Sequence, residues 1–134
     1  MTLARMPDIL TLTMNPALDI STAIDRVEPV HKLRCGPHQT HPGGGGINVA
    51  RVLHRLGSRV RAIYTAGGPL GRELSALLDA EGVPSQVVPI AGGTRESFSV
   101  FERCSGQDFR FVLPGPTLTE PEWTACLDAV VAGL

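Results

Sequence analysis

Four consecutive glycines, Gly43 to Gly46, constrain the fold of this chain more than any other feature of its sequence. Glycine loses more backbone entropy on ordering than any other residue and packs no side chain, so such a run is unsuited to the interior of a helix or strand. It fits a loop whose backbone approaches a ligand closely or takes positive φ values. A flexible linker would share the composition, but Pro42 stiffens one side and a helical pattern begins directly on the other.

The residues after the glycines predict a helix that ends near Gly57. Its apolar positions are Ile47, Val49, Ala50, Val52, Leu53 and Leu56. Asn48 falls in the first turn, where side-chain amides and free backbone N–H groups point toward whatever the loop holds. The spacing excludes a P-loop, and Asn48 occupies the third glycine position of a G-x-G-x-x-G pattern that starts at Gly43. We therefore expect a glycine loop at a helix N-terminus that binds an oxygen-rich or anionic small molecule.

Composition narrows the class of protein. The chain has 134 residues, 43% of them hydrophobic, which suffices for one domain with a core, and twelve basic residues face thirteen acidic ones. No basic run suggests a nucleic-acid partner, and no apolar run approaches the length of a membrane span. Three widely spaced cysteines, Cys35, Cys104 and Cys126, favour reduced thiols, and the first seven residues lack the apolar stretch of a signal peptide. We expect a cytoplasmic protein.

Strands and helices alternate along the chain, which predicts an α/β fold with a mostly parallel sheet and right-handed crossovers. Strands are expected over 8–13, 59–65 and 85–90, a helix over 72–81, and a hairpin of 97–102 with 108–113. Residues 20–40 show no helical periodicity and predict short extended segments away from the main sheet, the second over 33–40. Cys35, His38 and His41 could suggest a metal site, but i, i+3 spacing on an extended segment directs successive side chains to opposite faces, so none is expected.

The last helix is marked by Thr119 and Glu122, which form a capping-box pattern. We expect its buried face to comprise Trp123, Cys126, Leu127, Val130 and Val131.

Two charged residues are candidates for ligand binding. Asp19 closes the turn 14–19 after the first strand, and ligand groups commonly lie beyond the carboxyl ends of parallel strands. An ordinary turn or cap aspartate is the alternative. Arg95 ends the loop 91–95, and a guanidinium grips phosphate or carboxylate with two parallel hydrogen bonds. A solvated loop arginine is the alternative there.

These segments together resemble the PfkB carbohydrate kinases of the ribokinase-like fold, most closely their minor 6-phosphofructokinase branch. The resemblance rests on residues 10–19, the run PGGGGINVAR, the turn 66–68 and Thr94-Arg95. It implies a parallel-sheet core with helices on both faces and a small β lid, with residues 1–134 as the N-terminal part of the kinase domain. The core would comprise 8–19, 42–96 and 114–134, and the lid 20–41 and 97–113.

The same resemblance implies roles for individual residues. Asp19 would bind sugar hydroxyls, Asn48 another hydroxyl and Arg95 the substrate's phosphate, while Lys32 would reach the sugar phosphate of a partner subunit. The lid would close over the sugar and pair two subunits into a homodimer. The loop residues whose backbone N–H groups would lie against the sugar are Gly43, Gly44, Gly45 and Gly46.

Two departures from the family pattern matter. Kinases of fructose 1-phosphate and tagatose 6-phosphate usually carry lysine where this chain has Gly45, which favours fructose 6-phosphate. The family's G-A-G-D motif, with its aspartate base, and its ATP pocket lie in a second half that these 134 residues do not contain. We therefore expect the sugar-binding and lid half of an ATP- and Mg²⁺-dependent kinase that converts fructose 6-phosphate to fructose 1,6-bisphosphate, with no catalytic residue of its own. A stand-alone, non-catalytic sugar-phosphate-binding or dimerisation module is the alternative.

Overall fold

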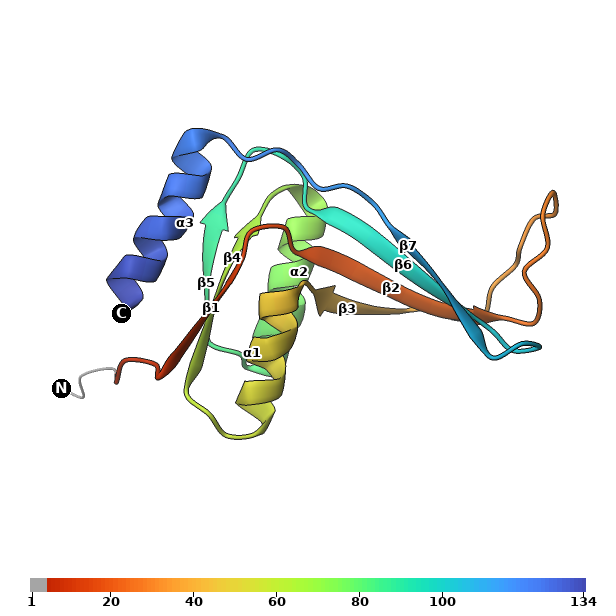
Figure 1. Ribbon diagram of the computed structural model, residues 1–134, viewed down its shortest axis with the longest axis horizontal. Helices are drawn as coiled ribbons and strands as arrows, with labels where there is room; N and C mark the ends of the chain where they lie inside the picture. The colour runs from red at the N-terminus through yellow and green to blue at the C-terminus, as the bar shows by residue number, and fades with distance from the viewer. Residues whose placement is uncertain (1–4) are drawn as a thin grey trace.

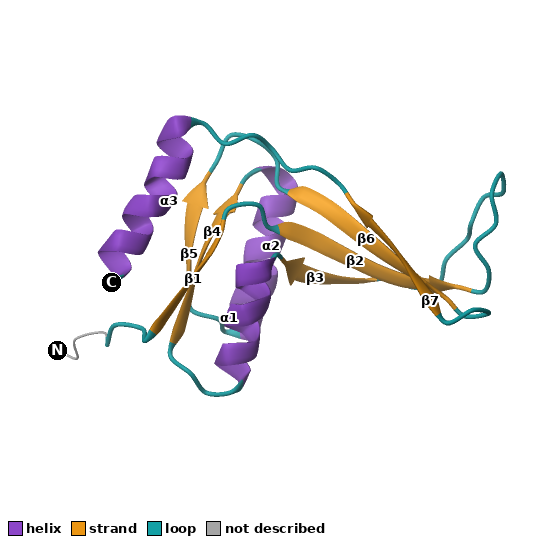
Figure 2. Ribbon diagram, viewed as in Figure 1, coloured by secondary structure: helices purple, strands orange, loops and turns teal. Residues whose placement is uncertain are grey.

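Residues 5–134 are described by a computed structural model, in which the chain forms two sheets (Figures 1 and 2). The core sheet has three parallel strands in the order β1-β4-β5, and the outer sheet has four strands in the order β3-β2-β6-β7. The core strands are β1 (Ile9–Thr13), β4 (Val60–Ala66) and β5 (Ser85–Pro89). The outer strands are β2 (Ala17–Ile24), β3 (Gln39–Gly43), β6 (Arg95–Glu102) and β7 (Gln107–Val112).

Helices cover both faces of the core sheet. The apolar side chains of β4 alternate, so that Ala62 and Tyr64 face α1 (Gly45–Arg55) and α2 (Gly68–Glu81), while Ile63 faces α3 (Glu120–Gly133). A buried cluster from α1, α2 and β4 fills one side, and Ile63, Val88, Cys126 and Ala129 fill the other. This arrangement confirms the predicted fold class, a parallel sheet with helices on both faces.

The outer sheet extends away from the core sheet (Figure 1). Its strand β2 pairs in parallel with β6 and antiparallel with β3, and β6 and β7 form the predicted hairpin. The chain crosses between the two sheets at four places: before β2, after β3, before β6 and after β7. The junction between the sheets is therefore built from segments that lie far apart in the sequence.

Several element boundaries differ from the sequence-based expectation. Strand β6 begins two residues early, at Arg95, which was expected in a loop and instead pairs with Ala17 of β2. Asp19 does not lie in a turn but is the third residue of β2, paired with both His41 and Ser97. The turn after β1 is short because Pro16 is followed at once by residues that pair on two sides. Strand β3 covers only the end of the expected segment 33–40 and runs on to Gly43. Helix α2 begins four residues early, at Gly68, because Pro69 is tolerated in a first turn.

The capping box of α3 is present. The Glu122 N–H donates to Thr119 Oγ1 at 3.4 Å, and the Thr119 N–H donates to Glu122 Oε1 at 2.9 Å. The predicted buried face is wrong for most of its residues, because Trp123, Leu127 and Val131 are 41%, 48% and 68% exposed. The residues that are buried are Cys126, Ala129 and Gly133. These small residues let the helix approach the sheet, and in a helix that is apolar on several sides periodicity does not identify the packed side.

The three cysteines are free thiols, with Cys126 buried and the other two exposed. Within the described part of the chain, none of the helices combines the length and the apolar character that crossing a membrane requires.

The contact between α1 and β1 generates a stability prediction. A Cβ added to Gly46 would lie 2.5 Å from Thr13 Oγ1 and 2.9 Å from the Leu12 carbonyl oxygen, whereas a Cβ added to Gly45 meets nothing within 4 Å. We expect Gly46→Ala to lower the free energy of unfolding by about 1–3 kcal/mol, because the strand must shift. Gly45→Ala should raise it by up to about 1 kcal/mol, because alanine favours the helix.

Urea unfolding of the two variants beside the unmodified chain measures the difference. Equal stability of the two alanine variants would show that α1 does not pack against β1 as closely as described.

Candidate functional site

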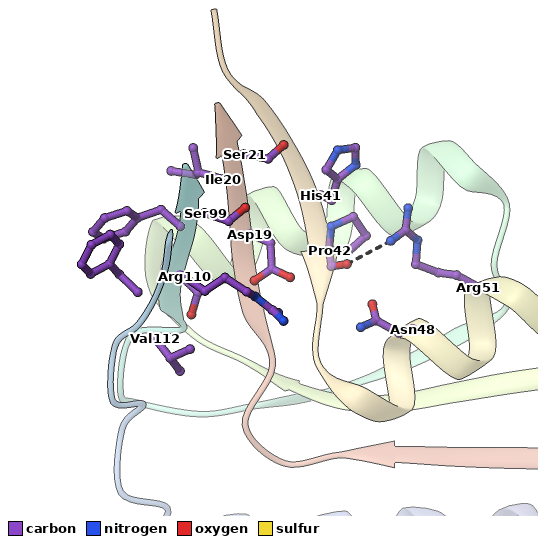
Figure 3. A pocket seen from close by; sticks show the side chains of 13 residues that line it. Asp19, Ile20, Ser21, His41, Pro42, Asn48, Arg51, Ser99, Arg110 and Val112 are labelled. Carbon is purple, nitrogen blue, oxygen red and sulfur yellow. Dashed lines mark hydrogen bonds between the residues drawn. The ribbon is translucent and has the colours of Figure 1, made fainter. Parts of the chain in front are cut away.

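A cavity of about 310 Å³ lies between the outer sheet and the start of α1 (Figure 3). Strands β2, β3, β6 and β7 and helix α1 all contribute to its lining. The polar side chains that line it are Asp19, Ser21, His41, Asn48, Arg51, Ser97, Ser99 and Arg110. The cavity therefore combines hydroxyl, amide, carboxylate, imidazole and guanidinium groups from five elements.

Asp19 supplies the carboxylate of the cavity. Partial burial raises the pKa of the Asp19 carboxyl above its ordinary value, while the positive charges of Arg95 and Arg110 act in the opposite direction. Figure 3 shows Arg110, from β7, directed toward Asp19. The carboxylate lies against the Cα of Gly43, where any side chain would collide with it. Glycine at position 43 is therefore required by the placement of Asp19.

The glycine loop leads directly into α1. Gly44 is the N-cap residue, with φ at 119°, and the Asn48 N–H donates to its carbonyl at 2.9 Å. A side chain at Gly44 would be strained by this φ and would also meet Thr13 and Pro16. The first N–H groups of an α-helix have no acceptor within the helix, and among residues 5–134 no side chain caps α1. These N–H groups are donors for an oxygen-rich ligand.

Arg95 is the first residue of β6 and is not among the residues that line the cavity. Its guanidinium donates to the Asn15 carbonyl from two nitrogens at 3.2 Å, and to the Leu113 carbonyl and Ser97 Oγ at 3.3 Å. Arg95 thus connects the segments before β2 and after β7, both of which cross between the sheets. Its role in phosphate binding stays a prediction.

Lys32 lies in the exposed loop between β2 and β3 and does not line the cavity either. The structure therefore brings Asp19 and Asn48 together in one cavity, and Gly43 lies against the Asp19 carboxylate. The predicted site residues that are not part of the lining are Gly43, Gly44, Gly45, Gly46, Arg95 and Lys32.

Sequence reasoning missed Arg110, His41 and Arg51, which line the cavity beside the predicted residues. Arg110 interrupts the apolar hairpin strand between Phe109 and Phe111, and a charge at that place was the available signal. His41 is brought opposite Asp19 by the register of β2 and β3, which the sequence alone does not specify.

The sequence pattern of the pfkB family of carbohydrate kinases matches residues 12–130. The chain belongs to this family. It is 57% identical over 122 residues to the ATP-dependent 6-phosphofructokinase isozyme 2 of Mycobacterium tuberculosis, and 44% identical over 118 residues to the protein of the same name in Escherichia coli K12. These matches cover 91% and 88% of this chain, but only 36% and 38% of the relatives.

Solved structures agree with this assignment. The crystal structure of phosphofructokinase-2 from Escherichia coli in complex with fructose-6-phosphate superposes with a TM-score of 0.90 at 42% identity, over 95% of this chain and 42% of that one. A putative ribokinase from Agrobacterium tumefaciens, at 17% identity and a TM-score of 0.72, shares the fold over 87% of this chain and 39% of that one. The chain thus spans less than half the length of these relatives.

The raised pKa of Asp19 generates a prediction about stability and pH. A carboxyl whose pKa is higher in the folded than in the unfolded chain destabilises the fold when charged, and this cost disappears as the pH falls through the raised pKa. We therefore expect Asp19→Asn to be at least as stable as the unmodified chain at pH 7. As the pH is lowered, the unmodified chain should gain stability relative to the variant.

Denaturant unfolding of both proteins between pH 7 and pH 4 measures this difference, since groups other than Asp19 cancel in the comparison. A variant that is less stable at pH 7, and whose deficit shrinks on acidification, would mean that the nearby arginines outweigh the burial of the carboxylate.

Proposed function

We propose that this chain is the sugar-binding part of an ATP-dependent kinase that phosphorylates fructose 6-phosphate to fructose 1,6-bisphosphate. The observation that carries the proposal is the convergence of Asp19, Asn48 and Arg110 on one cavity beside the glycine loop of a pfkB-family chain. A carboxylate and an amide match sugar hydroxyls, and a guanidinium matches a phosphate. The names of the relatives, phosphofructokinases from two organisms, agree with this ligand.

Each residue has a proposed role. Asp19 accepts hydrogen bonds from sugar hydroxyls, Asn48 binds a further hydroxyl, and the backbone N–H groups of Gly43–Gly46 lie against the sugar. Arg110 and Arg95 bind the phosphate, Arg95 by leaving its carbonyl partners, whose hydrogen bonds of 3.2–3.3 Å are long. Lys32 of one subunit reaches the phosphate held by the other.

The choice of sugar phosphate rests on Gly45. This position has open space around it, so a lysine would fit there, and the kinases of fructose 1-phosphate and tagatose 6-phosphate that the chain resembles usually have one. Its absence supports fructose 6-phosphate over these two alternatives.

The aspartate base and the ATP site of the complete kinase are proposed to belong to sequence outside these 134 residues. Mg²⁺ acts together with ATP in the kinases that the chain resembles, and we assign it to the same further part. We propose a cytoplasmic enzyme. By itself, this chain would bind the sugar phosphate without transferring phosphate to it, as a stand-alone binding module also would.

The phosphate ligands are tested with alanine variants. Arg110→Ala and Arg95→Ala should each raise the Kd for fructose 6-phosphate at least tenfold, because a charge-assisted hydrogen bond contributes about 1.5–3 kcal/mol. Calorimetric titration of the chain measures this, and Arg95→Ala in the complete kinase should raise KM for the sugar phosphate by a similar factor. Arg103→Ala is the control, since Arg103 pairs with the exposed Asp25 away from the cavity.

An unchanged Kd for Arg95→Ala, together with a raised one for Arg110→Ala, would remove Arg95 from the phosphate site. Unchanged values for both would contradict the assignment of the cavity.

We also propose that the outer sheet is a lid that pairs two copies into a homodimer. An apolar cavity of about 400 Å³ lies on this sheet and includes Ile20, Leu33, Phe98, Phe109 and Phe111. Strands β3 and β7 are its edges, and exposed apolar surface of this kind marks association sites.

Leu33→Asp tests the dimer, because Leu33 is 41% exposed and lines the apolar cavity. Leu33 does not line the cavity of about 310 Å³ at the start of α1, which we call the sugar cavity. Sedimentation should show a dimer for the unmodified chain at micromolar concentration, and a dissociation constant at least tenfold higher for the variant. Val131→Asp on α3 is a matched control that places the same charge on exposed apolar surface elsewhere. A monomeric unmodified chain with an ordered outer sheet would contradict the proposal.

A further inference from the structure

Arg51 lines the sugar cavity, but its hydrogen bonds are made to other groups of the protein. It lies one turn after Asn48 on α1, and its side chain is only 15% exposed. Its Nε and Nη2 atoms donate to the two carboxylate oxygens of Glu81 at 2.7 and 2.6 Å. Its Nη1 donates to the Pro42 carbonyl at 3.2 Å, and Figure 3 shows this bond. Three of its five N–H donors are thus used within the protein.

Glu81 occupies a position that is unfavourable for an acidic residue. It is the last residue of α2, where the helix dipole disfavours a negative charge, and no basic residue lies in the last turn of that helix. Its hydrogen bonds to Arg51 lower the pKa of the Glu81 carboxyl, and Arg55 adds a weaker contact at 3.6 Å. Glu81 does not line the sugar cavity. Its pairing with Arg51, and not contact with a ligand, therefore accounts for an acidic residue at this helix end.

Pro42 is the residue just before the glycine loop. It belongs to β3, an edge strand of the outer sheet, and its carbonyl is the group that Arg51 holds. The bond from Arg51 therefore connects the outer sheet to α1, and the pair with Glu81 extends the connection to α2.

We propose that Arg51 is a positioning residue, which uses Glu81 as an anchor to fix the Pro42 carbonyl and thereby the start of the glycine loop. It acts through the backbone at Pro42 and not by binding the sugar phosphate directly. The part of the test that uses a ligand rests on the proposed function, whereas the part that follows the loop itself does not.

The test compares Arg51→Met and Glu81→Ala, singly and combined, in the full 134-residue chain. We expect amide hydrogen exchange of Asn48, whose N–H donates to the Gly44 carbonyl, to become at least tenfold faster in each single variant than in the unmodified chain. The double variant should exchange no faster than either single variant, because both changes break one connection. The Kd for fructose 6-phosphate should rise at least fivefold in each, again without a further rise in the double variant.

Two controls separate positioning from general loosening. Arg55→Met removes only the weaker contact to Glu81, and Tyr64→Phe removes the 2.8 Å hydrogen bond from Tyr64 to Ser75 that ties α2 to the core sheet. Neither should change the exchange of the Asn48 amide. If Arg51→Met or Glu81→Ala does not fold, Glu81→Gln provides a milder change with the same expected direction.

Unaltered exchange of the Asn48 amide in the Glu81 variants would overturn the inference, whether or not the chain binds sugar phosphate. So would a raised Kd for Arg51→Met with an unchanged or lowered Kd for Glu81→Ala, because Arg51 would then be a direct ligand. A chain that binds no fructose 6-phosphate but shows the expected exchange would contradict the proposed function and leave the positioning role supported.

Discussion

The close approach between the glycine loop and the two strands beneath it is the constraint on which the rest of the structure depends. Gly46 lies against Thr13 and the Leu12 carbonyl, and Gly43 lies against the Asp19 carboxylate. Thr13 Oγ1 is buried without a hydrogen-bond partner among the described residues, so this contact carries an energetic cost. With side chains in the loop, α1 could not begin beside Asp19, and Asn48 would not reach the same cavity.

The site lies at the junction of the two sheets, and arginines hold that junction together. Arg95 connects the crossing before β2 with the crossing after β7, and Arg51 connects the end of β3 with α1 and α2. Arg110 places a positive charge beside the carboxylate from the outermost strand. Any movement of the outer sheet relative to the core would therefore change the distances among the charged groups of the cavity, and the proposed lid over a sugar phosphate depends on such a change.

The sequence predicts much of this arrangement because its strongest signals are local. The glycine run, the apolar spacing of α1 and the capping box at Thr119 each determine an element without reference to the remainder of the chain. The parallel sheet follows from the alternation of strands and helices. What the sequence does not predict depends on pairing between distant segments: the place of Asp19 inside β2, the entry of Arg110 into the cavity, and the carbonyl partners of Arg95. The packed side of α3 was predicted wrongly because small residues, and not the large apolar ones, face the sheet.

The account is tested most directly by titrating the purified 134-residue chain with fructose 6-phosphate and assaying the same sample with Mg-ATP. It predicts saturable binding of fructose 6-phosphate, with amide chemical shifts changing at Asp19, the glycine loop and Arg110, and no formation of fructose 1,6-bisphosphate. Turnover by this chain would mean that the catalytic base has been misplaced. Shift changes confined to another part of the molecule, or no binding at all, would contradict the assignment of the cavity as a sugar-phosphate site.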